Sequence, residues 1–331
     1  QVQARLPAGS AMFPVHLRKA GYYVSNNVKT DYNVVAGKVW DESSRKASWR
    51  NRPDKEMPFF HMQSFGMSHE SSLHFKRPQM NVEELTTSPD DVTVFPYHPD
   101  TPTFRYTYAR YHDRMRVVDQ AIGRVIDQLR EDGLMENTFV FYFGDHGGVL
   151  PRSKGYIYES GLHVPMVVHI PQEYRQLVSQ QPGTRQDGFV EFVDFAPTVL
   201  NLAGVDIPDT MDGTPFLGSA VSLEEVEKRD EAFGHADRFD EKYDFCRSLR
   251  TGKYKYIRNY HCYYPDGLQN NYRYRMLAFA EWRELSRAGE LNDEQDQFFN
   301  RRAAEQLFDL EADPHEVHDL SGDPAHAEVL Q

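Results

Sequence analysis

A long amphipathic pattern followed by a short apolar run constrains the fold of this chain more than any other feature. Between residues 103 and 132, apolar and aromatic side chains recur at steps of four and three, which is one face of an α-helix: Tyr111, Met115, Val118, Ile122, Val125 and Leu129. Gly133 ends this helix, and residues 139–143, FVFYF, follow. Such a continuous run is typical of a strand buried on both faces. Helix, short loop and buried strand predict an α/β domain.

The rest of the chain divides into two regions that differ in their predicted secondary structure. Strands are predicted at 22–26, 58–63 and 164–170, and helices at 10–20 and 194–203. After a stretch rich in proline, glycine and charge, a hairpin turning at Gly252 and a helix over 272–288 are predicted. We therefore expect a large α/β domain over residues 1–220, with a mostly parallel central sheet flanked by helices. A smaller C-terminal α+β subdomain with an antiparallel sheet is expected over residues 221–331.

Composition excludes some classes of function. With 37 basic and 50 acidic residues, the 331-residue chain has a net charge of −13. That charge argues against a general nucleic-acid binder or a binder of anionic membranes, because both need a basic surface. No run of 18 apolar residues is present, so no membrane span is expected. The two cysteines, Cys246 and Cys262, are predicted to be free thiols.

Chemically reactive side chains follow the predicted buried strand directly. Asp145 and His146 lie in the run Gly144-Asp-His-Gly-Gly148. Ligands of α/β proteins bind at the carboxyl ends of strands, and carboxylate and imidazole can together bind a divalent cation. Lys154, eight residues on, could hold an anion as a point charge. Taken separately, the sequence Asp145-His146-Gly147 is also typical of a turn with a side-chain cap. Lys154 taken alone is also consistent with an exposed loop lysine.

The combined pattern is more specific. Residues 144–171, GDHGGVLPRSKGYIYESGLHVPMVVHIP, closely resemble the corresponding block of the type I, formylglycine-dependent sulfatase family within the alkaline phosphatase superfamily. The resemblance extends over nearly the whole chain, through the segments 19–33, 65–70, 193–204, 254–258 and 305–314.

The resemblance implies a role for each matching residue. Asp145 and His146 would be two ligands of a Ca²⁺ or Mg²⁺ ion. Lys29 and Lys154 would hold sulfate oxygens, and His69 would protonate the leaving alcohol. This set is chemically coherent, because the metal and lysines neutralise the sulfate oxygens while an acid offsets charge on the leaving oxygen.

Further assignments are weaker. Many relatives have a histidine two residues after the first lysine, where this chain has Asp31, so Asp31 is only a weak candidate for the base. Arg152 and His163 flank the block and are candidate substrate contacts. The reaction implied is hydrolysis of sulfate esters on a sulfated oligo- or polysaccharide, outside the cell or in the periplasm. A formylglycine-generating or equivalent maturase is the implied partner, and an oligomer is left open.

One departure from the family leaves alternatives open. The Cys/Ser-x-Pro-x-Arg motif, which carries the residue converted to formylglycine, is absent, as is the strand with paired Asp residues that completes the metal site. We expect both to precede residue 1. The alternatives are a catalytically inactive relative that binds sulfated glycans and a phosphate or phosphonate ester hydrolase of the same superfamily.

Overall fold

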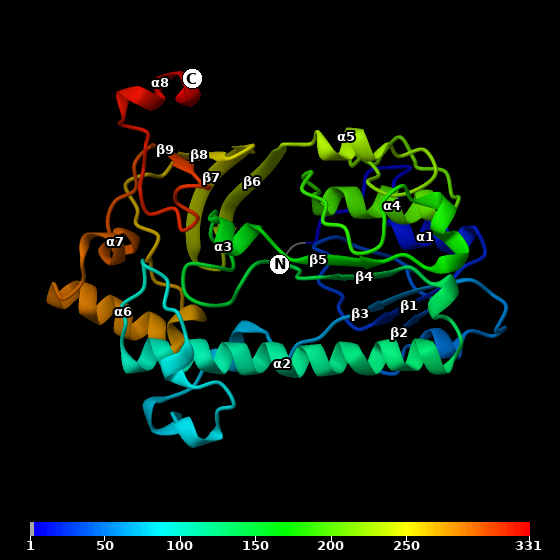
Figure 1. The fold of residues 1–331 in the computed structure, drawn as a ribbon, viewed down its shortest axis with the longest axis horizontal. Helices are drawn as coiled ribbons and strands as arrows, with labels where there is room; N and C mark the ends of the chain where they lie inside the picture. Colours follow the sequence, from blue (N-terminus) through cyan, green and yellow to red (C-terminus); the bar gives the residue numbers. More distant parts are fainter. Residues whose placement is uncertain (1–2) are drawn as a thin grey trace. The chain divides into compact units, whose positions relative to one another are not determined.

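The computed structural model describes residues 3–331, which form two compact units (Figure 1). The first unit contains the chain up to Phe65 together with Ile170–Arg229, and the second contains Gly66–His169 and Asp230–Gln331. The predicted boundary after residue 220 does not separate these units, because each is built from two stretches far apart in sequence. Long-range contacts, which no local pattern reports, decide the division.

The first unit holds a small parallel sheet with helices beside it. The strand order is β2-β1-β3, and Val24 of β1 lies in register with Phe60 of β3. Leu17, Val24 and Leu200 form its fully buried core. The elements are α1 (Phe13–Lys19), β1 (Tyr23–Asn27), β2 (Glu42–Ser43), β3 (Phe59–Gln63), α4 (Phe195–Leu202) and α5 (Leu223–Glu227).

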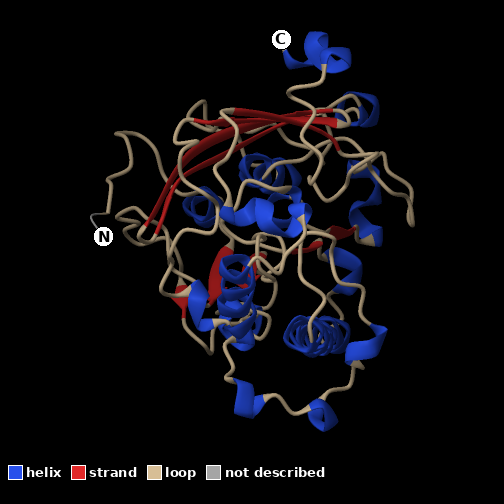
Figure 2. Ribbon diagram, turned by 90° about the vertical axis from the view of Figure 1, so that its left-hand side faces the viewer, coloured by secondary structure: helices blue, strands red, loops and turns tan. Residues whose placement is uncertain are grey.

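The second unit combines a long helix, a two-stranded sheet and a four-stranded antiparallel sheet of order β6-β7-β8-β9 (Figure 2). Together with the parallel sheet of the first unit, these elements confirm the predicted fold class. The elements are α2 (Pro102–Glu131), β4 (Val140–Phe143), α3 (Glu159–Leu162), β5 (Met166–His169), β6 (Glu231–Phe239), β7 (Lys242–Thr251), β8 (Tyr254–Asn259), α6 (Leu277–Ala288), α7 (Asp293–Asp296), β9 (Glu305–Asp309) and α8 (Ala327–Leu330).

Helix α2 begins and ends where the sequence predicts. The Thr101 hydroxyl accepts a hydrogen bond from the Phe104 amide at 3.2 Å, Pro102 occupies the first turn, and Gly133 adopts a φ of 69° just past the end. Helix α6 packs against α2, where Glu281 accepts hydrogen bonds from the hydroxyls of Thr101 and Thr103. No helix within residues 3–331 has the length and apolar character needed to cross a membrane.

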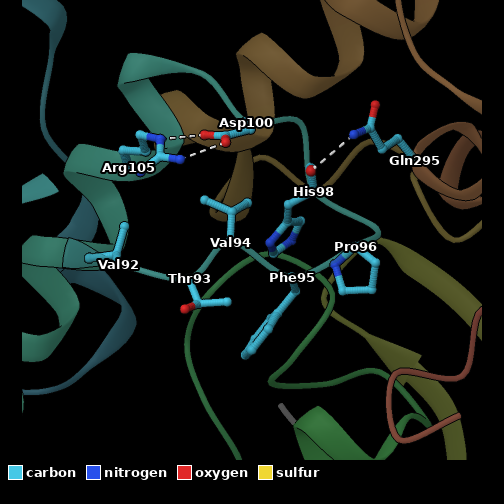
Figure 3. Close-up of a pocket in the computed structure, with 9 residues that line it drawn as sticks. All are labelled: Val92, Thr93, Val94, Phe95, Pro96, His98, Asp100, Arg105 and Gln295. Carbon is cyan, nitrogen blue, oxygen red and sulfur yellow. Dashed lines mark hydrogen bonds and ion pairs between the residues drawn. The ribbon is translucent and has the colours of Figure 1, made fainter. Parts of the chain in front are cut away.

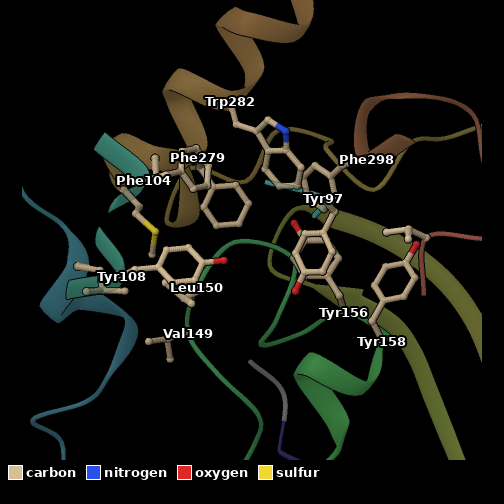
Figure 4. Packing of buried hydrophobic residues seen from close by; sticks show 14 of the residues in the cluster. Tyr97, Phe104, Tyr108, Val149, Leu150, Tyr156, Tyr158, Phe279, Trp282 and Phe298 are labelled. Atoms are coloured by element: carbon tan, nitrogen blue, oxygen red, sulfur yellow. The ribbon is translucent and has the colours of Figure 1, made fainter. Parts of the chain in front are cut away.

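Aromatic side chains fill the core of the second unit (Figure 4). The rings of Trp282 and Phe298 stack with centroids 4.4 Å apart, and Tyr156 packs against Phe298 at 5.2 Å. Offset and edge contacts of this kind add stability beyond the apolar area they bury. This core brings the loop after β4 together with α2 and α6, which are far from it in sequence.

Strand β4 differs from its prediction as a strand buried on both faces. Tyr142 and Phe143 are exposed, and β4 pairs antiparallel with β5 as its one strand partner within residues 3–331. The continuous apolar run therefore predicts the strand correctly, but not how fully its faces are covered in this unit.

Candidate functional site

The loop after β4 is folded tightly against the start of α3. Gly147 and Gly148 donate backbone hydrogen bonds to the carbonyls of Gly161 and Ser160, at 2.8 and 2.9 Å. A Cβ atom at position 147 would overlap the carbonyl group of Ser160, so only glycine allows this close approach. The predicted Asp-His-Gly-Gly turn is therefore a rigid element rather than a loose surface loop.

Asp145 and His146 present oxygen and nitrogen to a common point. The ring Nδ1 of His146 lies 2.8 Å from the carbonyl oxygen of Gly147 and must donate to it, so the neutral ring carries its lone pair on Nε2. That Nε2 atom is 3.4 Å from Oδ1 of Asp145, whose side chain is 75% exposed. Two acceptors facing each other at this distance fit a shared cation, with the Nδ1 hydrogen bond setting the tautomer for metal binding.

Asp145 and His146 have no third metal-binding side chain gathered with them among residues 3–331. Within residues 3–331, no three His, Cys, Asp or Glu side chains gather closely enough to hold an ion. Asp145 and His146 therefore fit a divalent cation as a partial ligand set. Further oxygen ligands would be needed to reach the six to eight that Ca²⁺ takes.

Lys154 is attached by its backbone to the same loop. Its amide donates to the carbonyl of Gly148 at 2.9 Å, and its own carbonyl accepts a hydrogen bond from the Nη2 group of Arg273. Gly155 follows with a φ of 74°, a conformation that side chains rarely adopt. The structure thus brings the predicted metal ligands and the predicted anion-binding lysine onto one braced loop system.

His69 precedes a short 3₁₀ helix, η2 (Glu70–Leu73), in the same unit. Its Nδ1 atom accepts from the Ser71 amide at 3.3 Å, so the neutral ring carries its proton on Nε2. Glu70 is buried beside it. Burial raises the pKa of the Glu70 carboxyl, and the positive charges of Arg273 and Lys154 oppose that rise. Lys154 therefore lies close enough to act electrostatically on the segment that carries His69.

Lys29 and Asp31 belong to the first unit, beyond the carboxyl end of β1. The buried side chain of Asn26 holds this turn: its Oδ1 accepts from the Lys29 amide at 3.2 Å, and its Nδ2 donates to the Lys29 carbonyl at 2.9 Å. The Lys29 ammonium pairs with Asp31 at 3.3 Å, and both side chains are largely exposed. Convergence of Lys29 with Lys154, which the resemblance implies, stays a prediction.

Arg152 does not lie where a substrate contact would place it. Its side chain is buried and donates to the carbonyls of His315 and Glu316 at 2.9 and 2.8 Å. The guanidinium also lies over the rings of Tyr97 and Tyr158. Every face of the group is thus occupied by its own unit, so we correct the prediction and assign Arg152 to packing.

His163 is at the C-terminal end of α3 and is well exposed, with Nδ1 3.6 Å from Oε2 of Glu159. Its role as a substrate contact stays a prediction. Glu159 itself is a structural residue, because its carboxylate accepts from Arg250 at 2.6 Å and from Lys255 at 3.1 Å. Glu159, within the run Tyr158-Glu-Ser-Gly161, is therefore held by contacts inside its own unit.

The residues that sequence reasoning missed are Glu70 and Arg273. Glu70 follows His69 directly in the sequence. Its distinguishing property is its burial, which the sequence does not show. Arg273 is 119 residues from Lys154, and no local pattern links the two.

A hollow of ≈ 420 Å³ lies in the second unit between residues 92–100 and the start of α2 (Figure 3). Arg105 and Asp100 close part of its rim with a two-point ion pair at 2.5 and 2.7 Å. None of the predicted site residues lines it, so we do not assign it to the reaction.

Comparisons with known proteins show the family of this chain and its fold. A family model described as Sulfatase matches residues 14–205, and one described as N-sulphoglucosamine sulphohydrolase, C-terminal, matches residues 144–268. An ulvan-active sulfatase of Formosa agariphila is 35% identical over 98% of this chain and 58% of its own length. The N-sulphoglucosamine sulphohydrolase of Homo sapiens is 24% identical over 73% of this chain and 49% of its own.

Among solved structures, a 2-O GAG sulfatase aligns with a TM-score of 0.66 and 15% identity, covering 99% of this chain and 73% of that one. At that identity the likeness concerns the fold alone. The chain spans about half to three fifths of the length of the two curated relatives above.

Proposed function

We propose that this chain, which belongs to the sulfatase family, acts in the hydrolysis of sulfate esters on a sulfated carbohydrate, with release of inorganic sulfate. The observation that carries the proposal is the braced loop of the second unit, where Asp145 and His146 converge and Lys154 is held by its backbone. The relatives whose names state activity on ulvan and on N-sulphoglucosamine support a carbohydrate as the substrate.

We further propose that Asp145 Oδ1 and His146 Nε2 are two ligands of a Ca²⁺ or Mg²⁺ ion. Carboxylate oxygen suits both hard cations, and the hydrogen bond between His146 Nδ1 and the Gly147 carbonyl favours the tautomer whose lone pair is on Nε2. When bound, such an ion would neutralise charge on the sulfate oxygens.

The groups of this chain would bind sulfate and move one proton. The ammonium groups of Lys154 and Lys29 would each take a sulfate oxygen as fixed positive charges. His69 would donate its Nε2 proton to the leaving sugar oxygen, and the hydrogen bond from the Ser71 amide to Nδ1 favours the tautomer that can do so. Asp31, paired with Lys29, remains a weak candidate for the base.

A formylglycine, made by a maturase, is the nucleophile that we propose from the family. Residues 1–331 contain no Cys/Ser-x-Pro-x-Arg motif, so the residues of this chain would bind, orient and protonate the substrate. We also propose that the enzyme works in the periplasm or outside the cell, because polymeric sulfated glycans are found there.

The test measures sulfate released from a panel of sulfated glycans by the full-length, maturated protein, with and without Lys154→Ala. We expect kcat/KM to fall by roughly a hundredfold or more, because one charge-stabilising donor is lost. Lys228→Ala, which removes an exposed lysine paired with Glu224, is the matched control and should keep full activity.

Parallel assays with phosphate monoesters and phosphonate esters distinguish the alternative hydrolase. Turnover of those esters without sulfate release would overturn the proposal. A protein that binds the glycans and hydrolyses none of the esters would instead be the inactive relative.

A further inference from the structure

Arg273 contacts the loop of Lys154 although it is 119 residues away from it in the sequence. It begins a short 3₁₀ helix, η9 (Arg273–Arg275), and its side chain is 1% exposed. Its Nη2 group donates to the carbonyl of Lys154. Its guanidinium also packs over two aromatic rings, 4.5 Å from the centroid of Tyr156 and 4.1 Å from that of Phe239. One arm of Arg273 therefore holds the loop that carries Lys154.

The other arm faces the segment that carries His69. The Nε atom of Arg273 is 3.7 Å from Oε1 of Glu70, a carboxylate that is also almost fully buried. Glu70 follows His69 in the chain, and η2 begins at Glu70. Arg273 thus lies between the two stretches of this unit that hold the candidate sulfate ligand and the candidate acid.

The hydrogen bonding of the Arg273–Glu70 pair is incomplete. Its Nη1 group and Oε2 of Glu70 are buried and lack a hydrogen-bond partner within the described residues. Arg302, a buried arginine of the same unit, instead reaches the carboxylates of Asp244 and Asp266 and two backbone carbonyls. A buried charge with incomplete partners costs stability. The incomplete pairing of Arg273 therefore favours a role in placing the groups that it contacts over a role in stability alone.

Neighbouring residues leave space for the Arg273 guanidinium and fix the backbone of Arg273. A Cβ atom at Gly155 would overlap Nη2 of Arg273, so a side chain there would displace the arginine. The base of Arg273 is fixed as well, because its amide donates to Oδ1 of the fully buried Asn270 at 2.9 Å. Both the tip and the base of the side chain are therefore held in place.

We propose that Arg273 is a positioning residue for the sulfate-binding site, which fixes the backbone of Lys154 and aligns it with the His69–Glu70 segment. The inference rests on the proposed function and adds to it a residue that acts through Lys154 rather than on the substrate. Nothing in its contacts reaches a reacting atom, so its effect must appear in the behaviour of Lys154.

A double-mutant cycle on the full-length, maturated protein tests this. Arg273→Met keeps the length of the side chain but removes its donors and charge, and we expect kcat/KM for sulfate release to fall about a hundredfold. Because Arg273 acts through Lys154, the double variant with Lys154→Ala should be no less active than Lys154→Ala alone. Losses that multiply in the double variant would overturn the inference.

Arg302→Met is the matched control, since it also removes a buried guanidinium of the second unit. It should lower the melting temperature while the folded protein keeps its kcat/KM. An equal loss of kcat/KM in both variants would show that Arg273 is merely structural.

Hydrogen exchange supplies a readout independent of activity. The Lys154 amide, bonded to the Gly148 carbonyl, should lose protection in Arg273→Met and keep it in Arg302→Met. If Arg273→Met does not fold, Gly155→Ala and Arg273→Lys replace it, and both should lower kcat/KM non-additively with Lys154→Ala. Unchanged protection would overturn the inference, whereas a wild-type protein without sulfate release would overturn only the proposed function.

Discussion

Asp145 and His146 show how two adjacent side chains can be prepared for a cation by a single backbone hydrogen bond. The Gly147 carbonyl accepts a hydrogen bond from Nδ1–H of His146, so in the neutral ring the lone pair is on Nε2, on the side of the Asp145 carboxylate. These two atoms would supply part of the ligand set of a bound cation.

Asp145→Asn should weaken metal-dependent activity without unfolding the protein, because the carboxylate is exposed. We expect chelation to abolish sulfate release by the wild type and Ca²⁺ or Mg²⁺ to restore it. The variant should need roughly tenfold more metal for the same recovery, since one charged ligand is lost. Asp187→Asn, an exposed carboxylate paired with Arg185, is the control. Full activity in the presence of chelator would contradict a metal at this position.

His98 illustrates the opposite case, a buried histidine with a structural role. Its ring bonds to the Tyr108 hydroxyl at 2.7 Å and to the Pro151 carbonyl at 3.0 Å. Burial holds the pKa of His98 well below its ordinary value, and the charge of Arg152 and the neighbouring His315 lower it further. The folded protein therefore keeps this ring neutral where the unfolded chain would protonate it.

That difference makes stability depend on pH. Since the folded-state pKa of His98 is lowered, its contribution is fully present above the unfolded pKa near 6.5 and is lost as the pH falls below it. In His98→Gln, the fall of unfolding free energy between pH 6.5 and 5 should be shallower by up to about 1.4 kcal/mol per pH unit. Urea unfolding at several pH values measures this, and identical slopes for both proteins would contradict it.

At the scale of elements, the segment from β4 to β5 depends on glycine where backbones touch. Gly147 and Gly161 both lie against carbonyl groups, Gly147 against Ser160 and Gly161 against Ser153 and Tyr156. This close backbone packing holds the loop that carries Asp145 and Lys154 in one conformation.

Two identical substitutions should therefore have opposite effects. Gly161→Ala should lower stability by about 1–3 kcal/mol, because the new methyl group has no space. Gly123→Ala, in the exposed interior of α2 with open space around it, should raise stability by about 0.5–1 kcal/mol. Melting temperatures of the two variants give the comparison, and a stabilised Gly161→Ala would show that the loop is looser than described.

At the scale of the whole molecule, the C-terminal stretch completes the second unit. Besides the bonds from Arg152 to the carbonyls of His315 and Glu316, the Glu316 carboxylate accepts from the Glu159 amide at 2.7 Å and pairs with the buried Lys255 at 2.9 Å. The loop after β4, the strand β8 and residues 313–320 are thereby joined through buried charges.

Arg152→Met should destabilise the protein by roughly 2–5 kcal/mol, because two buried carbonyls lose their donors. Arg185→Met removes an exposed arginine paired with Asp187 and should change stability by less than about 1 kcal/mol. Urea unfolding gives both values. If Arg152→Met instead kept full stability and raised KM alone, the original assignment of Arg152 to the substrate would be restored.

Local patterns in the sequence predicted the elements that depend on neighbouring residues. The steps of four and three residues located α2, and the turn at Gly252 located the β7–β8 hairpin. The strand β6 was missed, because its half-buried positions at 232, 234 and 236 carry only alanine and glycine, so the alternation has no large apolar side chains to mark it. Periodicity reports burial on one face, so it finds elements whose faces are buried in the expected way.

The sequence by itself determined the fold class, the family and the residue types at the candidate metal and sulfate ligands, since these depend on short motifs. Only the tertiary structure decided that Arg152 is a packing residue and that Arg273 contacts Lys154. It also decided that both compact units are discontinuous. The physical reason is distance along the chain: contacts between residues more than a hundred positions apart arise from packing and buried charge, which local sequence patterns do not record.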